Sequence, residues 1–209
     1  MIKENETAPN VFTDAGEQWV DVMVEALRNS DFDKSKELGH HKSWKSINFK
    51  NGMVPEAHPD FGRLIKPSEE PQYLLISTHD RSQDVTKKVS PSSVLPDDHP
   101  TYAVENFGKV RIYSEAVTRN VGHLFAPITG WDGQEFSWIT MPVVSNIQRS
   151  DGGTRKADPL KDELKNEDPN WVVHDEEVGE HNGEQVLLDY GMFWYEGDWK
   201  VSESQLFDP

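Results

Sequence analysis

The stretch from Trp171 to Phe207 most constrains the fold, because aromatic residues, β-branched residues and turn signals are concentrated in it. Asn182-Gly183 favours a tight hairpin turn, since both central residues of such a turn need positive φ, which Asn tolerates and Gly adopts freely. Glu196-Gly197-Asp198 is a second turn signal. We therefore expect a C-terminal β-meander of two strand pairs, 171–173 with 186–188 and 192–195 with 199–201.

The first predicted element is an amphipathic helix over about residues 14–29. Asp14 with Glu17 three residues later forms a capping-box pattern that predicts the helix start. Apolar residues from Ala15 to Leu27 occupy one arc of about 200° at 100° per residue. So wide an arc predicts burial on two sides. We expect the aromatic strand layer of the meander to close the core under this helix.

Between these two ends the pattern indicates strands separated by long loops. Residues 44–50 and 109–117 alternate with period two, and 73–77 is a continuous apolar run typical of a central, doubly buried strand. Residues 135–144 also read as a strand, which Pro142 places at a sheet edge or bulge because proline cannot donate to the ladder. A turn is expected at 130–133 before that strand, and a long proline-containing loop at 80–100.

These elements predict a β-rich α+β fold. We expect a mostly antiparallel sheet, or a partly open barrel or sandwich, with the one N-terminal helix and the C-terminal meander. At 209 residues the chain fits a single domain over 1–209, with a weak candidate sub-boundary in the charged linker 148–170. Asp158-Pro159 predicts a short helix inside that linker, through Leu164, because proline is tolerated at the first helical position.

Charge and composition restrict the classes of partner. The net charge of −16 disfavours direct binding to nucleic acid or anionic membranes by Coulomb repulsion. With no cysteine, disulfides and thiolate chemistry are excluded. No run approaches the roughly 18 apolar residues of a membrane span, and the first residues lack the features of a signal peptide. We expect a soluble protein, intracellular or in a virion, with no cofactor.

Histidines and one acidic run invite a catalytic or metal-site hypothesis. The acidic run Asp175-Glu176-Glu177 lacks the pattern of an EF-hand calcium loop and reads as a solvated turn. His40, His41, His58, His79 and His99 lie near carboxylates, but without the helical spacing of metal ligands. His41-Lys42-Ser43 and His99-Pro100-Thr101 superficially resemble the paired H-x-[ST] motifs of two-histidine phosphoesterases, whose imidazoles act as base and acid. The lysine and proline in the middle positions depart from the apolar strands of that family. We therefore predict no catalytic residue and no metal site.

A further alternative is a sugar-binding platform formed by Phe193, Trp194, Tyr195 and Trp199. In a strand, Phe193 and Tyr195 point one way and Trp194 the other, so core packing of at least one face is favoured.

Taken together, these patterns favour a non-enzymatic structural or interaction protein. We expect it to form homo- or hetero-oligomers as a subunit of a larger assembly, such as a virus or phage particle. The alternatives are an acidic DNA mimic that inhibits a nucleic-acid-binding protein, and a small metal- or histidine-dependent hydrolase. The candidate partner-facing surface is an acidic rim made of Asp158, Asp162, Glu163, Asp175, Glu176, Glu177 and Glu180.

Overall fold

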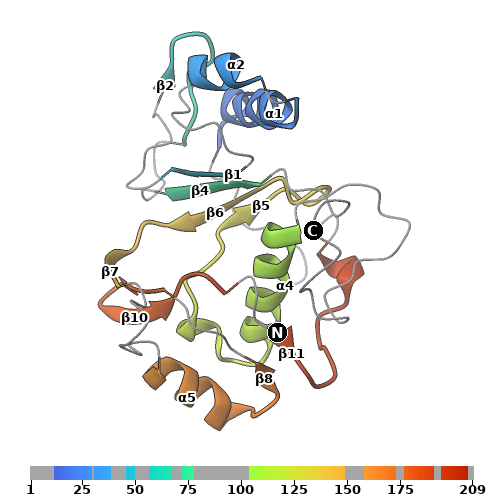
Figure 1. The fold of residues 1–209 in the computed structure, drawn as a ribbon, viewed down its shortest axis with the longest axis vertical. Coiled ribbons are helices and arrows are strands. Elements are labelled where there is room, and N and C mark those ends of the chain that lie inside the picture. The colour runs from blue at the N-terminus through green and yellow to red at the C-terminus, as the bar shows by residue number, and fades with distance from the viewer. Residues whose placement is uncertain are drawn as a thin grey trace.

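An open antiparallel sheet lies between two helical layers in the computed structural model (Figure 1). Its strand order is β1 (Ser46–Phe49), β4 (Gln72–Ser77), β6 (Trp138–Pro142), β5 (Gly130–Trp131). The fold is thus mixed α+β, as expected. The described residues are 12–29, 31–38, 46–49, 57–66, 72–77, 104–148, 158–172, 177–190 and 194–206. The predicted loop at 80–100 lies outside them.

The central strand β4 is buried on both faces. Leu74 and Ile76 point to one side and Leu75 to the other, because side chains alternate along a strand. The continuous apolar run therefore corresponds to the doubly buried strand that it predicts.

The position of β6 differs from the expected one. It lies inside the sheet between β4 and β5, not at an edge. Pro142 is tolerated there because it is the last residue of β6 and pairs with Gln72 alone, beyond the two residues that pair with β5. The turn also shifts, since Gly130 and Trp131 form β5 and the chain turns at residues 133–135.

Helix α1 (Asp14–Arg28) covers one face of the sheet together with α2 (Phe32–Glu37). Its N-cap is Thr13 and not Asp14: the Thr13 hydroxyl accepts a hydrogen bond from the Gly16 amide at 3.1 Å. Thr13 can do this because its own amide is held by the Leu64 carbonyl at 3.0 Å. A Cβ at Gly16 would lie 2.1 Å from the Leu64 carbonyl oxygen, so only glycine allows this close approach.

Helix α4 (Val104–Thr118) covers the other face and corrects the strand predicted at 109–117. Its buried residues include Phe107, Lys109, Arg111 and Glu115, which spread around the whole helix. A helix that is covered on all sides shows no polar stripe at period 3.6, so its periodicity is lost. Asn106 ties α4 to the sheet by donating to the Leu75 carbonyl at 3.4 Å and the Phe136 carbonyl at 2.8 Å.

The C-terminal third forms two small sheets and not the expected meander. The Asn182-Gly183 turn is present, with φ of 53° and 84°, but it joins β9 (Val178–His181) to β10 (Glu184–Leu187), and β9 also pairs with β7 (Ser145–Gln148). The strand β8 (Trp171–Val172) pairs with β11 (Trp194–Tyr195), whereas β10 pairs with β9. Within the described residues, neither predicted pair forms, 171–173 with 186–188 or 192–195 with 199–201. Strand partners here are set by long-range packing, which local turn signals do not report.

The shorter elements complete the described part of the chain. Helix α5 (Asp158–Glu167) begins at the predicted Asp-Pro and runs past Leu164. The remaining elements are β2 (Ala57–His58), β3 (Gly62–Arg63), and the 3₁₀ turns η2 (Gly122–Leu124) and η3 (Glu203–Gln205).

The four-stranded sheet separates two hydrophobic clusters. The cluster on the α1 side includes Phe12, Trp19 and Leu27, whereas the larger cluster surrounds α4 and includes Trp171 and Tyr190. The described C-terminal aromatic side chains therefore pack on the face opposite α1, which corrects the expectation that they close the core under it. Leu160 and Leu164 of α5 join the α4 cluster. The single domain and the sub-boundary at 148–170 stay predictions.

Candidate interaction surface and the α4 latch

The acidic rim predicted from the sequence spans α5 and β9. Asp162 and Glu163 are exposed on α5. Glu177 directly precedes β9 and Glu180 lies within it, and both are half-buried. Asp158 is the first residue of α5, and its side chain is not described. Asp175 and Glu176 lie outside the described residues. Whether these groups face a partner stays a prediction.

A shallow groove adjoins this rim between the end of α4, η2 and the β9–β10 hairpin, and we call it the hairpin groove. Its volume is about 540 Å³. Val117, Phe125, Pro127 and Val186 give it an apolar lining, and Val117 is 38% exposed. A single exposed apolar side chain is ordinary on a protein surface, so the candidate rests on the grouping of Val117 with the other apolar lining residues in one groove.

Titratable side chains border the hairpin groove. His123 lines it, and its Nε2 lies 3.5 Å from Glu163 Oε1, which connects the groove to the acidic rim. Glu184 and His181 line it from the hairpin. Burial raises the pKa of the Tyr113 hydroxyl, so this lining residue stays neutral at ordinary pH. The groove therefore combines apolar contact area with carboxylates.

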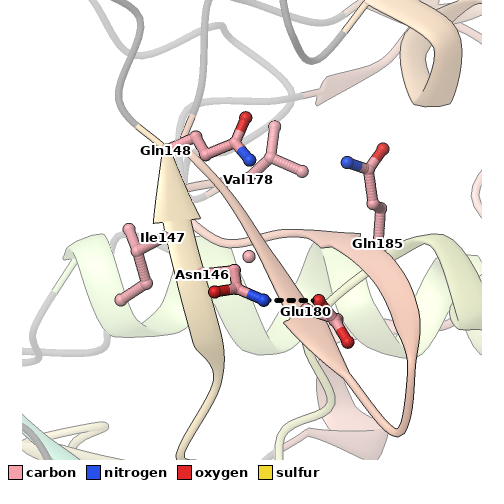
Figure 2. A pocket seen from close by; sticks show the side chains of 7 residues that line it. Asn146, Ile147, Gln148, Val178, Glu180 and Gln185 are labelled. Carbon is pink, nitrogen blue, oxygen red and sulfur yellow. Dashed lines mark hydrogen bonds between the residues drawn. The ribbon is translucent and has the colours of Figure 1, made fainter.

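A second hollow of about 350 Å³ lies on the face of the three-stranded sheet (Figure 2). Asn146 donates a hydrogen bond to Glu180 Oε2 at 2.7 Å, so this carboxylate of the rim already has a partner. The next residue, Ile147, is 40% exposed. Asn146 has φ of 50°, and the β7–β9 register is irregular between Ser145 and Gln148. Such a bulge disfavours the addition of another strand at the β7 edge.

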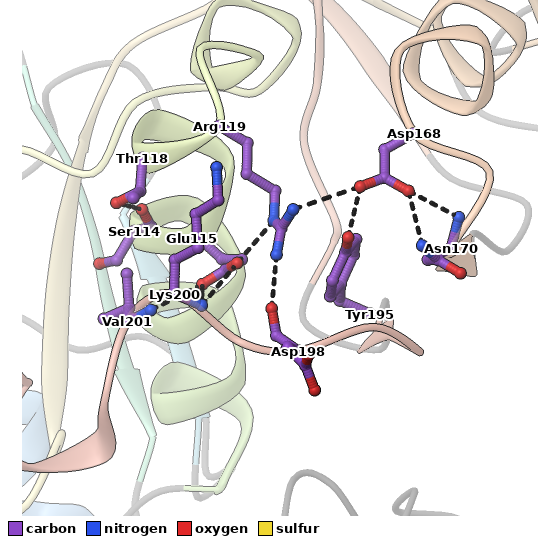
Figure 3. A network of polar contacts seen from close by, with 10 residues as sticks. All are labelled: Ser114, Glu115, Thr118, Arg119, Asp168, Asn170, Tyr195, Asp198, Lys200 and Val201. Atoms are coloured by element: carbon purple, nitrogen blue, oxygen red, sulfur yellow. Dashed lines mark hydrogen bonds and ion pairs between the residues drawn. The ribbon is translucent and has the colours of Figure 1, made fainter.

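A buried polar network joins α4 to the C-terminal segment (Figure 3). The Glu115 carboxylate is 0% exposed and accepts from Arg119 Nε at 2.6 Å, from the Lys200 amide at 3.0 Å and from the Val201 amide at 2.9 Å. Arg119 also donates to the Asp198 carbonyl at 2.6 Å. We call Glu115 and Arg119 the latch. Its partners are mostly backbone groups, so it holds a peptide segment in place.

Arg119 connects the latch to a second pair, Asp168 and Tyr195. Its guanidinium donates to Asp168 Oδ2 at 3.2 Å and lies 3.8 Å from the centre of the Tyr195 ring, and the Tyr195 hydroxyl donates to Asp168. Burial acts to raise the pKa of Asp168, but hydrogen bonds from Tyr195 and Asn170 and the charge of Arg119 together hold it below its ordinary value. Burial and the bond to Asp168 raise the pKa of Tyr195.

His58 has a structural role in the described part of the chain. Its Nδ1 accepts from the Asp60 amide at 3.1 Å, which leaves the proton on Nε2, 3.3 Å from the Glu37 carbonyl. The described residues contain no group of three or more histidine or carboxylate side chains that could hold a metal ion. The other histidines named for that hypothesis, His40, His41, His79 and His99, lie outside the described residues.

The aromatic residues proposed as a sugar platform are partly in the core. Tyr195 is 3% exposed and packs edge-on against Trp171 and Trp199, at ring distances of 5.1 and 6.1 Å. So deeply buried a ring offers no face to a sugar. The guanidinium of Arg111 covers Trp199 at 4.0 Å. Phe193 lies outside the described residues, and the Trp194 side chain is not described.

The sequence reasoning missed the latch and the hairpin groove. Glu115 and Arg119 have the i,i+4 spacing of a helical ion pair, but the strand predicted at 109–117 hid this signal. The groove is assembled from segments about 60 residues apart, so no local motif marks it.

Comparisons with family models, curated proteins and solved structures find no match to this chain. No helix in the described part of the chain is long and apolar enough to cross a membrane.

Proposed function

We propose that this chain is a non-enzymatic interaction protein, a subunit of a larger protein assembly such as a virus or phage particle. The observation that carries the proposal is the hairpin groove, which is lined by the exposed Val117 and by the carboxylate of Glu184. Apolar contact supplies affinity at such a site, and the surrounding charges select the partner.

Charge defines the partner. Residues 158–184 contain ten acidic and two basic side chains. Glu184 lines the groove, and Glu163 lies 3.5 Å from its lining residue His123. The fitting partner is a protein segment with an apolar side chain flanked by lysine or arginine, because such a segment fills the groove and neutralises its border.

The acidic-mimic alternative differs from this proposal in the part played by Val117. A mimic of DNA binds through its carboxylates, so its complex with a basic protein needs charge but no apolar contact. The hydrolase alternative needs His41, His79 or His99 to converge on a pocket, and is tested by replacing them and assaying turnover of a cyclic phosphate ester.

The test compares two exposed apolar residues of similar exposure, Val117 at 38% and Ile147 at 40%. The probe is a labelled peptide with alternating leucine and lysine, and its binding is followed by fluorescence anisotropy. We expect Val117→Ser to weaken binding about fivefold, the equivalent of about 1 kcal/mol of lost apolar contact. Ile147→Ser is the matched control and should leave binding unchanged.

Three outcomes distinguish the hypotheses. Equal effects of the two substitutions would remove the hairpin groove from the proposal. Binding that depends steeply on salt and ignores Val117→Ser would favour the acidic mimic. A chain that stays monomeric in light scattering at all concentrations and binds no basic peptide would contradict the assembly role.

A further inference from the structure

The C-terminal segment 195–206, which we call the strap, is held by residues far away in the sequence. After β11 it forms no further strand and has only the short turn η3. Its backbone is bound by the latch at residues 198, 200 and 201, and Trp131 Nε1 donates to the Leu206 carbonyl at 3.3 Å. Each of these partners lies at least 75 residues before the strap residue that it binds.

The strap also inserts apolar anchors into the cluster around α4. Tyr195, Val201 and Leu206 are buried, and Trp199 packs against the same cluster. Between these anchors the side chain of Lys200 is exposed while its amide binds Glu115. The surface of α4 therefore recognises a peptide by its backbone and by the spacing of its apolar residues, and the structure shows the bound peptide.

We propose that α4 also takes the strap of a second copy of this chain, so that neighbouring subunits exchange straps. An exchanged strap makes the same contacts as a strap bound within its own chain, because none of these contacts requires residues next to it in sequence. Exchange also brings no new charge to the contact, since Arg119 already compensates Glu115. This matters for a chain of net charge −16, because copies that carry a large charge of the same sign repel each other.

Concentration decides which form is populated. A segment tethered to its own binding site has an effective concentration on the order of millimolar, so exchange requires a comparable local concentration of chains. An assembly provides this, and in that respect the inference rests on the proposed function. Dilute protein should hold its strap within one chain.

The test mixes two full-length variants with complementary defects. Lys200→Pro removes the amide that binds Glu115 but leaves α4 intact, and the exposed Lys200 side chain is not part of the core. Glu115→Gln weakens the latch but leaves the strap intact. We expect each variant alone to be monomeric and the mixture to form a one-to-one complex of twice 23.9 kDa in size exclusion with light scattering.

The control replaces Lys200→Pro by Lys200→Ala, which keeps the amide and should give no complex. The inference is overturned if the Lys200→Pro mixture stays monomeric while hydrogen exchange shows that the amide of residue 201 is unprotected in both variants. Self-association of the wild type combined with that result would leave the proposed function standing and remove strap exchange alone.

A second measurement keeps the latch intact in case a variant does not fold. The chain has no cysteine, so Asn120→Cys and Asp198→Cys, carried on separate copies, are the only thiols available to a long bismaleimide. Both sites are exposed, and the neighbouring Arg119 contacts the Asp198 carbonyl. At millimolar protein we expect more cross-linked dimer from this pair than from Asn120→Cys with the exposed Asp60→Cys, whereas equal yields would contradict exchange.

Discussion

Replacing Glu115 tests whether one buried carboxylate holds the C-terminal strap. Glu115→Gln keeps the volume but turns one acceptor oxygen into a donor that faces the donors of Arg119, Lys200 and Val201. A hydrogen bond to a charged group contributes about 1.5–3 kcal/mol, and the remaining oxygen keeps part of the interaction. We therefore expect a loss of about 2–3 kcal/mol. Glu115→Ala removes both acceptor oxygens and leaves the amides of Lys200 and Val201 without their partner, while Arg119 keeps Asp168. We expect this substitution to cost about 3–5 kcal/mol, since each buried donor left unpaired costs about 1–3 kcal/mol.

Two measurements check this expectation. Urea unfolding gives the change in the free energy of unfolding, and hydrogen exchange reports whether the amides of Lys200 and Val201 lose protection. Glu163→Gln is the matched control, because that carboxylate is half exposed and its substitution should change stability by less than about 0.5 kcal/mol. If Glu115→Gln behaves like the control and both amides stay protected, the strap is held by apolar packing and the latch argument is wrong.

Two further predictions concern other parts of the fold. Because the pKa of Asp168 is lowered in the folded state, its contribution to stability is present above the unfolded pKa of about 4 and is lost as pH falls through the folded pKa. The difference in the free energy of unfolding between wild type and Asp168→Asn, measured in urea, should therefore be larger at pH 6 than at pH 3. An unchanged difference would contradict the pKa shift. Gly183 has φ of 84° with open space at its Cβ position, so Gly183→Ala should lower the free energy of unfolding by about 1 kcal/mol through the backbone alone, whereas Glu184→Ala beside it should change it little.

The sequence alone was sufficient to predict an element wherever that element has one solvent-exposed side or a distinctive boundary residue. Helix α1 begins and ends within one residue of the expected range, because one side of it faces water and its apolar arc can be read at period 3.6. The Asp-Pro start of α5 and the Asn-Gly turn of the β9–β10 hairpin follow from backbone preferences of the residues themselves. The apolar run of β4 is long enough to indicate burial on both faces.

Tertiary structure decided the rest, and the reason is that burial on all sides removes the local signal. The sheet covers one side of α4 and the strap another, so polar groups such as Glu115 and Arg111 lie inside and the apparent period is two. The pairing of β8 with β11, across more than 20 residues, depends on which surfaces meet in three dimensions. The latch and the hairpin groove exist only after α4 has formed and the C-terminal strap and the β9–β10 hairpin have packed against it. The i,i+4 spacing of Glu115 and Arg119 becomes a signal only when that stretch is known to be a helix, and no run of residues points to the groove.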